Sequence, residues 1–218
     1  MYLKKMSRPL RSKLVQFHDV SQNTDEWLDM RIAKLTGSGC PKIMANFGKA
    51  FGEPAKKLAV SIAREQVTGK RSMSESFSNQ HTERGHKQEP VARGLYESKY
   101  FVEVSNGGFF DCGNSGCSPD GLVYDDGLIE IKSVLDYVHY ANIKRNNIDP
   151  AYKWQIYFNL LKTERKWIDF VSYCADFPER TRLFVFRVNR NECTEYFKQI
   201  EKREVEFFKL VDEIKQFI

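Results

Sequence analysis

Apolar residues in the first half of the chain recur at helical spacing. After Pro54, the residues Leu58, Ile62 and Ala63 fall on one face of a helix, because positions three and four apart lie one above the other. Proline suits a first helical turn and glycine a helix end, so Pro54 and Gly69 mark the two boundaries. The same spacing predicts helices over about 54–68, 83–100 (kinked or restarted at Pro90), 136–145, 150–162 and 191–217. The serine-rich stretch 70–80 predicts a mobile connection.

From residue 101 the apolar period changes to two, which is typical of strands. Strands are expected over 101–105, 109–112, 121–124 and 128–133, as an antiparallel meander, and again over 167–174 and 183–188. The order strand, helix, strand across 128–174 predicts a right-handed crossover that places two strands side by side in parallel. The expected fold is α/β, with a mixed central β-sheet flanked by helices. Residues 1–218 form one domain, with a helical part at about 20–100, a sheet core at about 101–190 and a final helix at about 191–217.

Composition and charge narrow the class of protein. The 218 residues include 34 Lys and Arg against 29 Asp and Glu, a formal charge of +5, which is compatible with a polyanionic partner. No apolar run reaches the roughly 18 residues of a membrane span, and the N-terminus lacks the apolar run of a secretory signal. Five cysteines without a C-x-x-C pair argue against a disulfide framework or a structural zinc site. We expect a soluble intracellular protein with free thiols.

Two acidic residues and one lysine are expected to meet in the predicted sheet. Residues two apart in a strand share a face, so Glu130 and Lys132 project together, while Ile129 and Ile131 point to the opposite, core side. A hairpin through residues 125–127 brings Asp120 beside Glu130. Carboxylates and backbone carbonyls suit Mg²⁺, which activates water and polarises phosphodiesters. The alternative is structural: Ser-Pro-Asp-Gly is a common turn, and Glu-x-Lys forms weak ion pairs on many exposed strands.

These residues resemble the PD-(D/E)xK nuclease motif, and the chain is similar to the lambda-exonuclease (YqaJ) branch of viral recombination nucleases. Pro119 and Asp120, followed by Glu130, Ile131 and Lys132, carry the motif itself. Three more motifs follow in family order: W-x-x-x-R … T-x-S from Trp27 to Ser38, G-x-x-x-E-P-x-A from Gly85 to Ala92, and C-S-P-D-G from Cys117 to Gly121. The similarity covers about residues 24–162 and implies a restriction-endonuclease-like core.

The resemblance also implies residue roles. Asp120, Glu130 and the backbone carbonyl of Ile131 would bind Mg²⁺, for which Mn²⁺ can substitute, with two ions in each site. Glu89 would approach the second ion through water, and Lys132 would orient or activate the attacking water. Gln155 would contact the nucleophile or the scissile phosphate, although relatives with Q-x-x-x-Y have a tyrosine where this chain has Asn159.

A pocket for a terminal 5′-phosphate is implied at Arg31, Ser38 and Ser118, because a guanidinium and two hydroxyls complement a phosphoryl dianion. The family implies an Mg²⁺-dependent, ATP-independent exonuclease that degrades one strand of linear duplex DNA from its 5′ end. It would release mononucleotides and leave 3′ single-stranded tails. A homotrimeric ring, a single-strand annealing protein as partner, and the cytoplasm of a bacterium or phage host belong to the same expectation. The alternatives are an endonuclease on the same core and a non-catalytic module that binds DNA ends.

Overall fold

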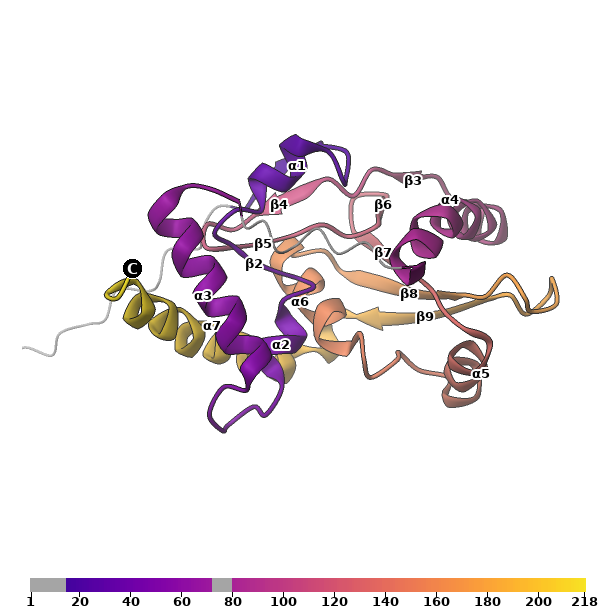
Figure 1. The fold of residues 1–218 in the computed structure, drawn as a ribbon. Coiled ribbons are helices and arrows are strands. Elements are labelled where there is room, and N and C mark those ends of the chain that lie inside the picture. Colours follow the sequence, from indigo (N-terminus) through magenta and orange to yellow (C-terminus); the bar gives the residue numbers. More distant parts are fainter. Residues whose placement is uncertain (1–14, 72–79) are drawn as a thin grey trace, which may run out of the picture.

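The computed structural model of the protein describes residues 15–71 and 80–218, and it places helices around two β-sheets (Figure 1). The larger sheet has five strands in the order β3-β6-β7-β8-β9. Strands β7 and β8 are parallel, and the other neighbours are antiparallel. The predicted mixed sheet and the parallel neighbours across the crossover are therefore confirmed. These strands span Val104–Ser105, Gly121–Val123, Gly127–Ser133, Trp167–Tyr173 and Leu183–Asn189, respectively.

A second sheet of four strands was not predicted. Its order is β1-β4-β5-β2, and its strands, listed in that order, span Gln16–His18, Phe109–Asp111, Ser115–Cys117 and Leu35–Thr36. The predicted single meander is wrong, because β3 pairs with β6 while β4 pairs with β1 and β5. The chain leaves the first sheet at Gly107 and Gly108. Gly108 has a φ of 57°, and a Cβ on Gly107 would lie 1.7 Å from the carbonyl oxygen of Pro119, so only glycine fits this crossing.

Helices α3 to α7 follow the predicted spacing closely, whereas α1 and α2 were not predicted. Gly69 ends α3 in the left-handed conformation, with a φ of 64°, as its position predicts. Helix α4 begins earlier than expected and continues through Pro90. None of the described helices is long and apolar enough to cross a bilayer. The basic residues of the first 14 positions, and residues 72–79 of the predicted connection, lie outside the described residues. The helices span Asp25–Met30 (α1), Cys40–Met44 (α2), Glu53–Thr68 (α3), Gln80–Tyr100 (α4), Asp136–Arg145 (α5), Lys153–Thr163 (α6) and Thr194–Lys215 (α7), with a 3-10 turn at Arg190–Glu192 before α7.

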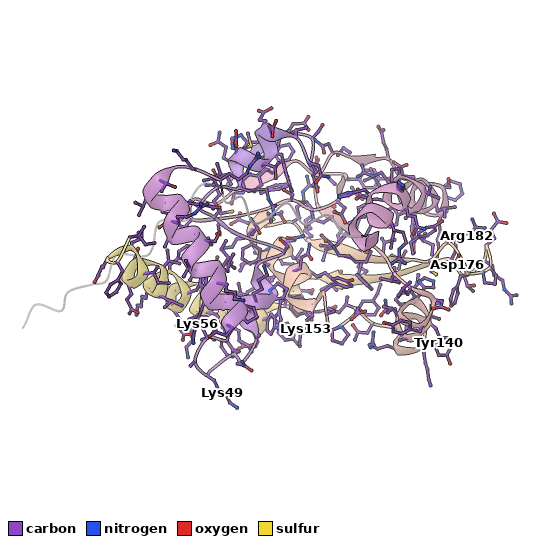
Figure 2. The ribbon with its side chains drawn as sticks, in the orientation of Figure 1. Lys49, Lys56, Tyr140, Lys153, Asp176 and Arg182 are labelled. Carbon is purple, nitrogen blue, oxygen red and sulfur yellow. The ribbon has the colours of Figure 1, made fainter. Side chains whose placement is uncertain are left out.

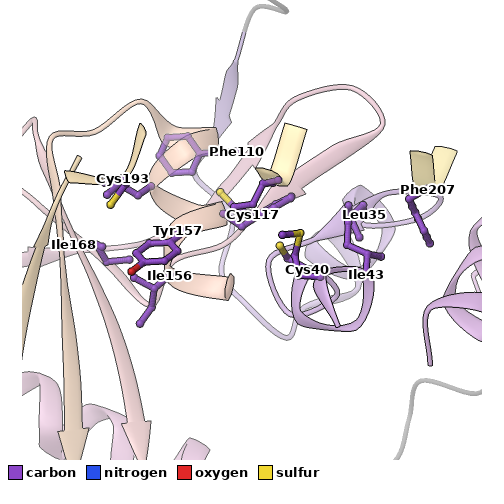
Figure 3. Packing of buried hydrophobic residues seen from close by; sticks show 14 of the residues in the cluster. Leu35, Cys40, Ile43, Phe110, Cys117, Ile156, Tyr157, Ile168, Cys193 and Phe207 are labelled. Carbon is purple, nitrogen blue, oxygen red and sulfur yellow. The ribbon is translucent and has the colours of Figure 1, made fainter. Parts of the chain in front are cut away.

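Both faces of the larger sheet are buried. On one face, Ile129 and Ile131 of β7 pack with Ala92 and Tyr96 of α4. On the other face, a larger apolar cluster joins β7 and β8 to α6 and extends to α2, α3 and α7, and Figure 3 shows part of it. All five cysteines are buried free thiols. Because α6 covers the face that carries Glu130, the side chain of Glu130 lies inside the protein and not on a solvated edge.

Candidate active site

The hairpin of β6 and β7 places Asp120 beside Glu130. Gly121 pairs with Ile129, so the next pair along the hairpin is Asp120 opposite Glu130. The backbone amide of Asp120 donates to the Ile129 carbonyl, and the amide of Ile131 donates to Oδ2 of Asp120 at 2.6 Å. The first bond holds the Asp120 backbone against β7, and the second fixes its side chain there. The prediction that the hairpin brings Asp120 beside Glu130 is confirmed.

Glu130 is completely buried and accepts hydrogen bonds from three side chains. Its Oε1 is 2.6 Å from the ammonium of Lys132 and 2.5 Å from Nε2 of Gln155. Its Oε2 accepts from Nδ2 of Asn159 at 2.8 Å. A buried carboxylate is costly unless it is paired, and these three donors supply that pairing. Lys132, in turn, lies 5.1 Å from the ring centre of Tyr152.

Helix α4 adds a third carboxylate, that of Glu89. Arg93, one turn further along, donates to Oε1 of Glu89 at 3.4 Å and also to the backbone carbonyl of Asp120. One guanidinium thus joins α4 to the start of β6. Arg93 was not predicted as a site residue, although its spacing of four from Glu89 places both on the same helix face.

The three carboxylates disfavour one another's charged forms. Burial, followed by the charge of Asp120, raises the pKa of Glu89, and the same two causes raise the pKa of Glu130 to about 7. Burial also raises the pKa of Asp120, against the opposing charge of Lys132. Burial alone would lower the pKa of Lys132, but Glu130 and Asp120 raise it above its usual value. Lys132 therefore stays an ammonium, and the three carboxylates repel one another wherever they are ionised together.

This cluster of charges opens into a cleft of about 1070 Å³. Glu89, Asp120 and Lys132 line it together with Ile131, and α5 contributes to its rim. Among the described residues, no three His, Cys, Asp or Glu side chains already form a metal-ligand group. The donor set nevertheless fits a hard divalent cation, because carboxylates and a backbone carbonyl are its usual ligands and their mutual repulsion is relieved by positive charge.

A second pocket, of about 340 Å³, holds two of the three predicted phosphate residues. Arg31 and Ser38 line it, and the Ser38 hydroxyl is 3.2 Å from that of Thr36. Ser118 is not among its lining residues; its hydroxyl instead accepts a hydrogen bond from Nε1 of Trp27 at 2.7 Å. The guanidinium of Arg31 stacks over the same Trp27 ring, 4.1 Å from its centre. The structure therefore connects Arg31 to Ser118 through Trp27.

Asn159 is the main residue that sequence reasoning missed as a contributor to the site. It lies four residues after Gln155 on α6, so both amides face Glu130. A Cβ on Gly37 would lie 2.4 Å from Oδ1 of Asn159. Gly37, between Thr36 and Ser38, therefore brings the edge of the second pocket against the residues that hold Glu130. The spacing of four residues between Gln155 and Asn159 could have predicted that both face the same side of the helix. The comparison with the Q-x-x-x-Y pattern instead treated Asn159 only as a departure from the expected tyrosine.

The fold is similar to those of solved exonucleases. An alkaline exonuclease from Laribacter hongkongensis is 27% identical, with a TM-score of 0.73, over 88% of this chain and 97% of that one. The structure of the same exonuclease with dAMP is 28% identical, with a TM-score of 0.75 and the same coverage. A phage-related exonuclease from Haemophilus somnus 129PT, at 16% identity and a TM-score of 0.58, covers 85% of this chain and 96% of that one and shares the fold. The core is thus restriction-endonuclease-like. No curated protein matches the chain.

The family model gives the most direct assignment. The YqaJ-like viral recombinase domain matches residues 26–166, which include β2, α4, the β6–β7 hairpin and α6. The matched range therefore contains every residue of the cleft cluster and of the second pocket discussed above. The chain belongs to the family of YqaJ-like viral recombinase domains.

Proposed function

We propose that this protein is an Mg²⁺-dependent, ATP-independent exonuclease that degrades one strand of linear duplex DNA from its 5′ end. The observation that carries the proposal is that Asp120 and Lys132 line the cleft while the buried carboxylate of Glu130 lies directly behind them, paired with Lys132 at 2.6 Å. The chain is also similar to solved exonucleases over most of its length. Its products would be mononucleotides and 3′ single-stranded tails.

Each residue at or behind the cleft would have a separate role. Asp120, Glu130 and the Ile131 carbonyl would hold Mg²⁺, or Mn²⁺ in its place, and Glu89 would serve a second ion. The bound ions would polarise the phosphodiester and lower the pKa of water. Lys132, kept charged by Glu130, would orient the attacking water and stabilise the negative charge that develops on the phosphoryl oxygens. Gln155 acts here through Glu130, to which it donates a hydrogen bond.

The second pocket supports end recognition. Arg31 and Ser38 line one concave site, and Trp27 links it to Ser118, two residues before Asp120. A 5′-phosphate bound by these residues would fix which phosphodiester reaches the cleft. This arrangement favours stepwise cleavage from an end over cutting at internal positions.

The biological setting is proposed from the family. A viral recombinase domain that produces 3′ tails would work with a single-strand annealing protein in the cytoplasm of a bacterium. A ring of three subunits around DNA would keep the enzyme on its substrate without ATP. The roles proposed for the cleft residues depend on neither the ring nor the partner protein.

Single substitutions in the hairpin test the proposal. With Mg²⁺, the wild-type protein should degrade linear duplex DNA that carries one 5′-phosphorylated end, and chelator should stop it. Asp120→Asn and Lys132→Ala should each lower the rate at least about 100-fold, because each removes charge at the reacting phosphate.

The matched control for these variants is Asp125→Asn, which changes an exposed carboxylate in the turn of the same hairpin and should keep the wild-type rate. Full activity in Asp120→Asn or Lys132→Ala would remove those residues from the mechanism. Binding of DNA ends without any hydrolysis by the wild type would favour the non-catalytic alternative.

A further inference from the structure

Helix α5 has a buried polar face and an exposed aromatic face. His139 and Asn142 are fully buried, and both contact the Ser172 hydroxyl of β8, at 2.8 and 3.2 Å. On the opposite side, Tyr137 and Tyr140 are 68% and 57% exposed. Figure 2 labels Tyr140 at α5. The contacts of His139 and Asn142 hold the helix against β8. The two tyrosines are mostly exposed, so packing in the core does not explain why aromatic residues occupy these positions.

The exposed residues follow one helix face. Tyr137, Tyr140 and Lys144 are three and four residues apart in turn, which places their side chains in a row. Lys144 is exposed, as is the adjacent Arg145. A row of two aromatic rings and a cation is the combination that single-stranded nucleic acid binds, with bases stacking on the rings and phosphates meeting the cation.

This face is continuous with the candidate active site. Leu135, Tyr137 and Val138 line the same cleft as Asp120 and Lys132. A strand that leaves the cleft in this direction would pass Tyr137 first and then Tyr140. Duplex DNA does not fit the surface as well, because its bases are already stacked and present no free ring faces.

We propose that the outer face of α5 binds single-stranded DNA that extends from the cleft, with Tyr137 and Tyr140 stacking on unpaired bases and Lys144 contacting the backbone. The inference deepens the proposed function and rests on it for the identity of the polymer. It adds a binding surface beyond the cleft and the second pocket.

Binding without hydrolysis tests the surface directly. The protein is titrated into a fluorescein-labelled oligothymidylate of about 16 nucleotides, in chelator, and anisotropy is recorded. Tyr137→Ala/Tyr140→Ala should weaken binding about tenfold or more, given the usual energy of base stacking. Tyr137→Phe/Tyr140→Phe, which keeps the rings, should bind like the wild type. Lys144→Ala should reduce the slope of log affinity against log salt by about 0.7.

Tyr124→Ala is the matched control. Tyr124 is 67% exposed in the turn between β6 and β7, so its loss removes an equally exposed ring from a different surface. Wild-type affinity in the Tyr137→Ala/Tyr140→Ala variant, or an equal loss in Tyr124→Ala, would overturn the proposal. A change in the molecular mass measured by light scattering, with oligonucleotide affinity unchanged, would assign the face to a contact between copies of the chain and also overturn it.

The two proposals can fail separately. If Asp120→Asn and the wild type are equally inactive on linear duplex, the nuclease function fails while the anisotropy result for α5 still stands. If the wild type degrades duplex and the tyrosine variants bind the oligonucleotide normally, only the α5 inference fails.

Discussion

At the scale of single residues, Glu130 shows how a buried carboxylate is accommodated. Lys132 follows it on the same strand, which the period of two predicts from sequence. Gln155 and Asn159 come from α6, and no local pattern could show that α6 docks on this face of the sheet. Each hydrogen bond to a charged group stabilises by about 1.5–3 kcal/mol, so three of them offset much of the cost of burying the charge.

Gly37 tests whether the amide of Asn159 must hold its position. Gly37→Ala places a Cβ against Oδ1 of Asn159, where the distance would be 2.4 Å, so the amide must move away from Glu130. We expect a loss of about 1–3 kcal/mol in the free energy of unfolding, measured with urea, together with a lower nuclease rate.

Gly94→Ala in α4 is the control for this substitution, because a Cβ there meets no atom within 4 Å and alanine favours helix. In an Asn159→Ala background, Gly37→Ala should cost less, since the clashing group has been removed. An undiminished cost in that double variant would show that Asn159 is not the residue displaced.

At the scale of elements, helix α5 and strands β1, β2 and β5 show what the sequence can and cannot predict. The bounds 136–145 follow from helical spacing and agree with the structure. Strands β1, β2 and β5 have two or three residues and were not predicted. Strands β3, β4 and β6 are as short, but each lies within a predicted apolar stretch, whereas β1, β2 and β5 are defined only by their partners in the sheet. The direction in which α5 faces depends on Ser172 of β8 and the Thr181 carbonyl, which are remote in sequence.

The attachment of α5 should depend on pH through His139. Burial lowers the pKa of His139 below its ordinary value, so between the folded and unfolded pKa values the unfolded chain binds more protons. The contribution of His139 to stability is therefore complete above about pH 6.5 and is lost as pH falls toward the folded pKa. At pH 8, His139→Asn should unfold with about 1–3 kcal/mol less free energy than the wild type.

Thermal and urea unfolding at pH 8, 7, 6 and 5 would measure this dependence as the difference between wild type and His139→Asn. That difference should shrink as the pH falls. A constant difference across the series would mean that His139 is not held neutral by burial, and that its contacts with Ser172 and Thr181 carry no linked protonation.

At the scale of the whole molecule, two sheets meet at the site. Parallel pairing of β2 with β5 brings the segment from Thr36 to Ser38 alongside the strand that leads to Ser118, while the larger sheet carries Glu130 and Lys132. The sequence predicted the larger sheet mainly through β7, β8 and β9, which have seven residues each and are long enough to show alternation. It could not predict the smaller one, so the route from Arg31 to Ser118 through Trp27 is visible only in the structure.

The form of the DNA substrate should separate end-dependent from internal cleavage. With Mg²⁺, linear duplex should be converted to acid-soluble nucleotides, and covalently closed circles of the same sequence should remain intact, because the 5′-phosphate site proposed at Arg31 and Ser38 would favour a strand end. Gel electrophoresis of both substrates over one time course gives the comparison. Nicking of the closed circles would favour the endonuclease alternative on the same core.

The hairpin of β6 and β7 also bears on the order in which the protein folds. The bond from Ile131 to Asp120 spans 11 positions, whereas those from Gln155 and Asn159 to Glu130 span 25 and 29. Shorter loops lose less entropy on closing and form sooner. The two carboxylates are thus expected to meet while the amides are still absent, so dissolved cations should assist an early step of refolding as well as the finished protein.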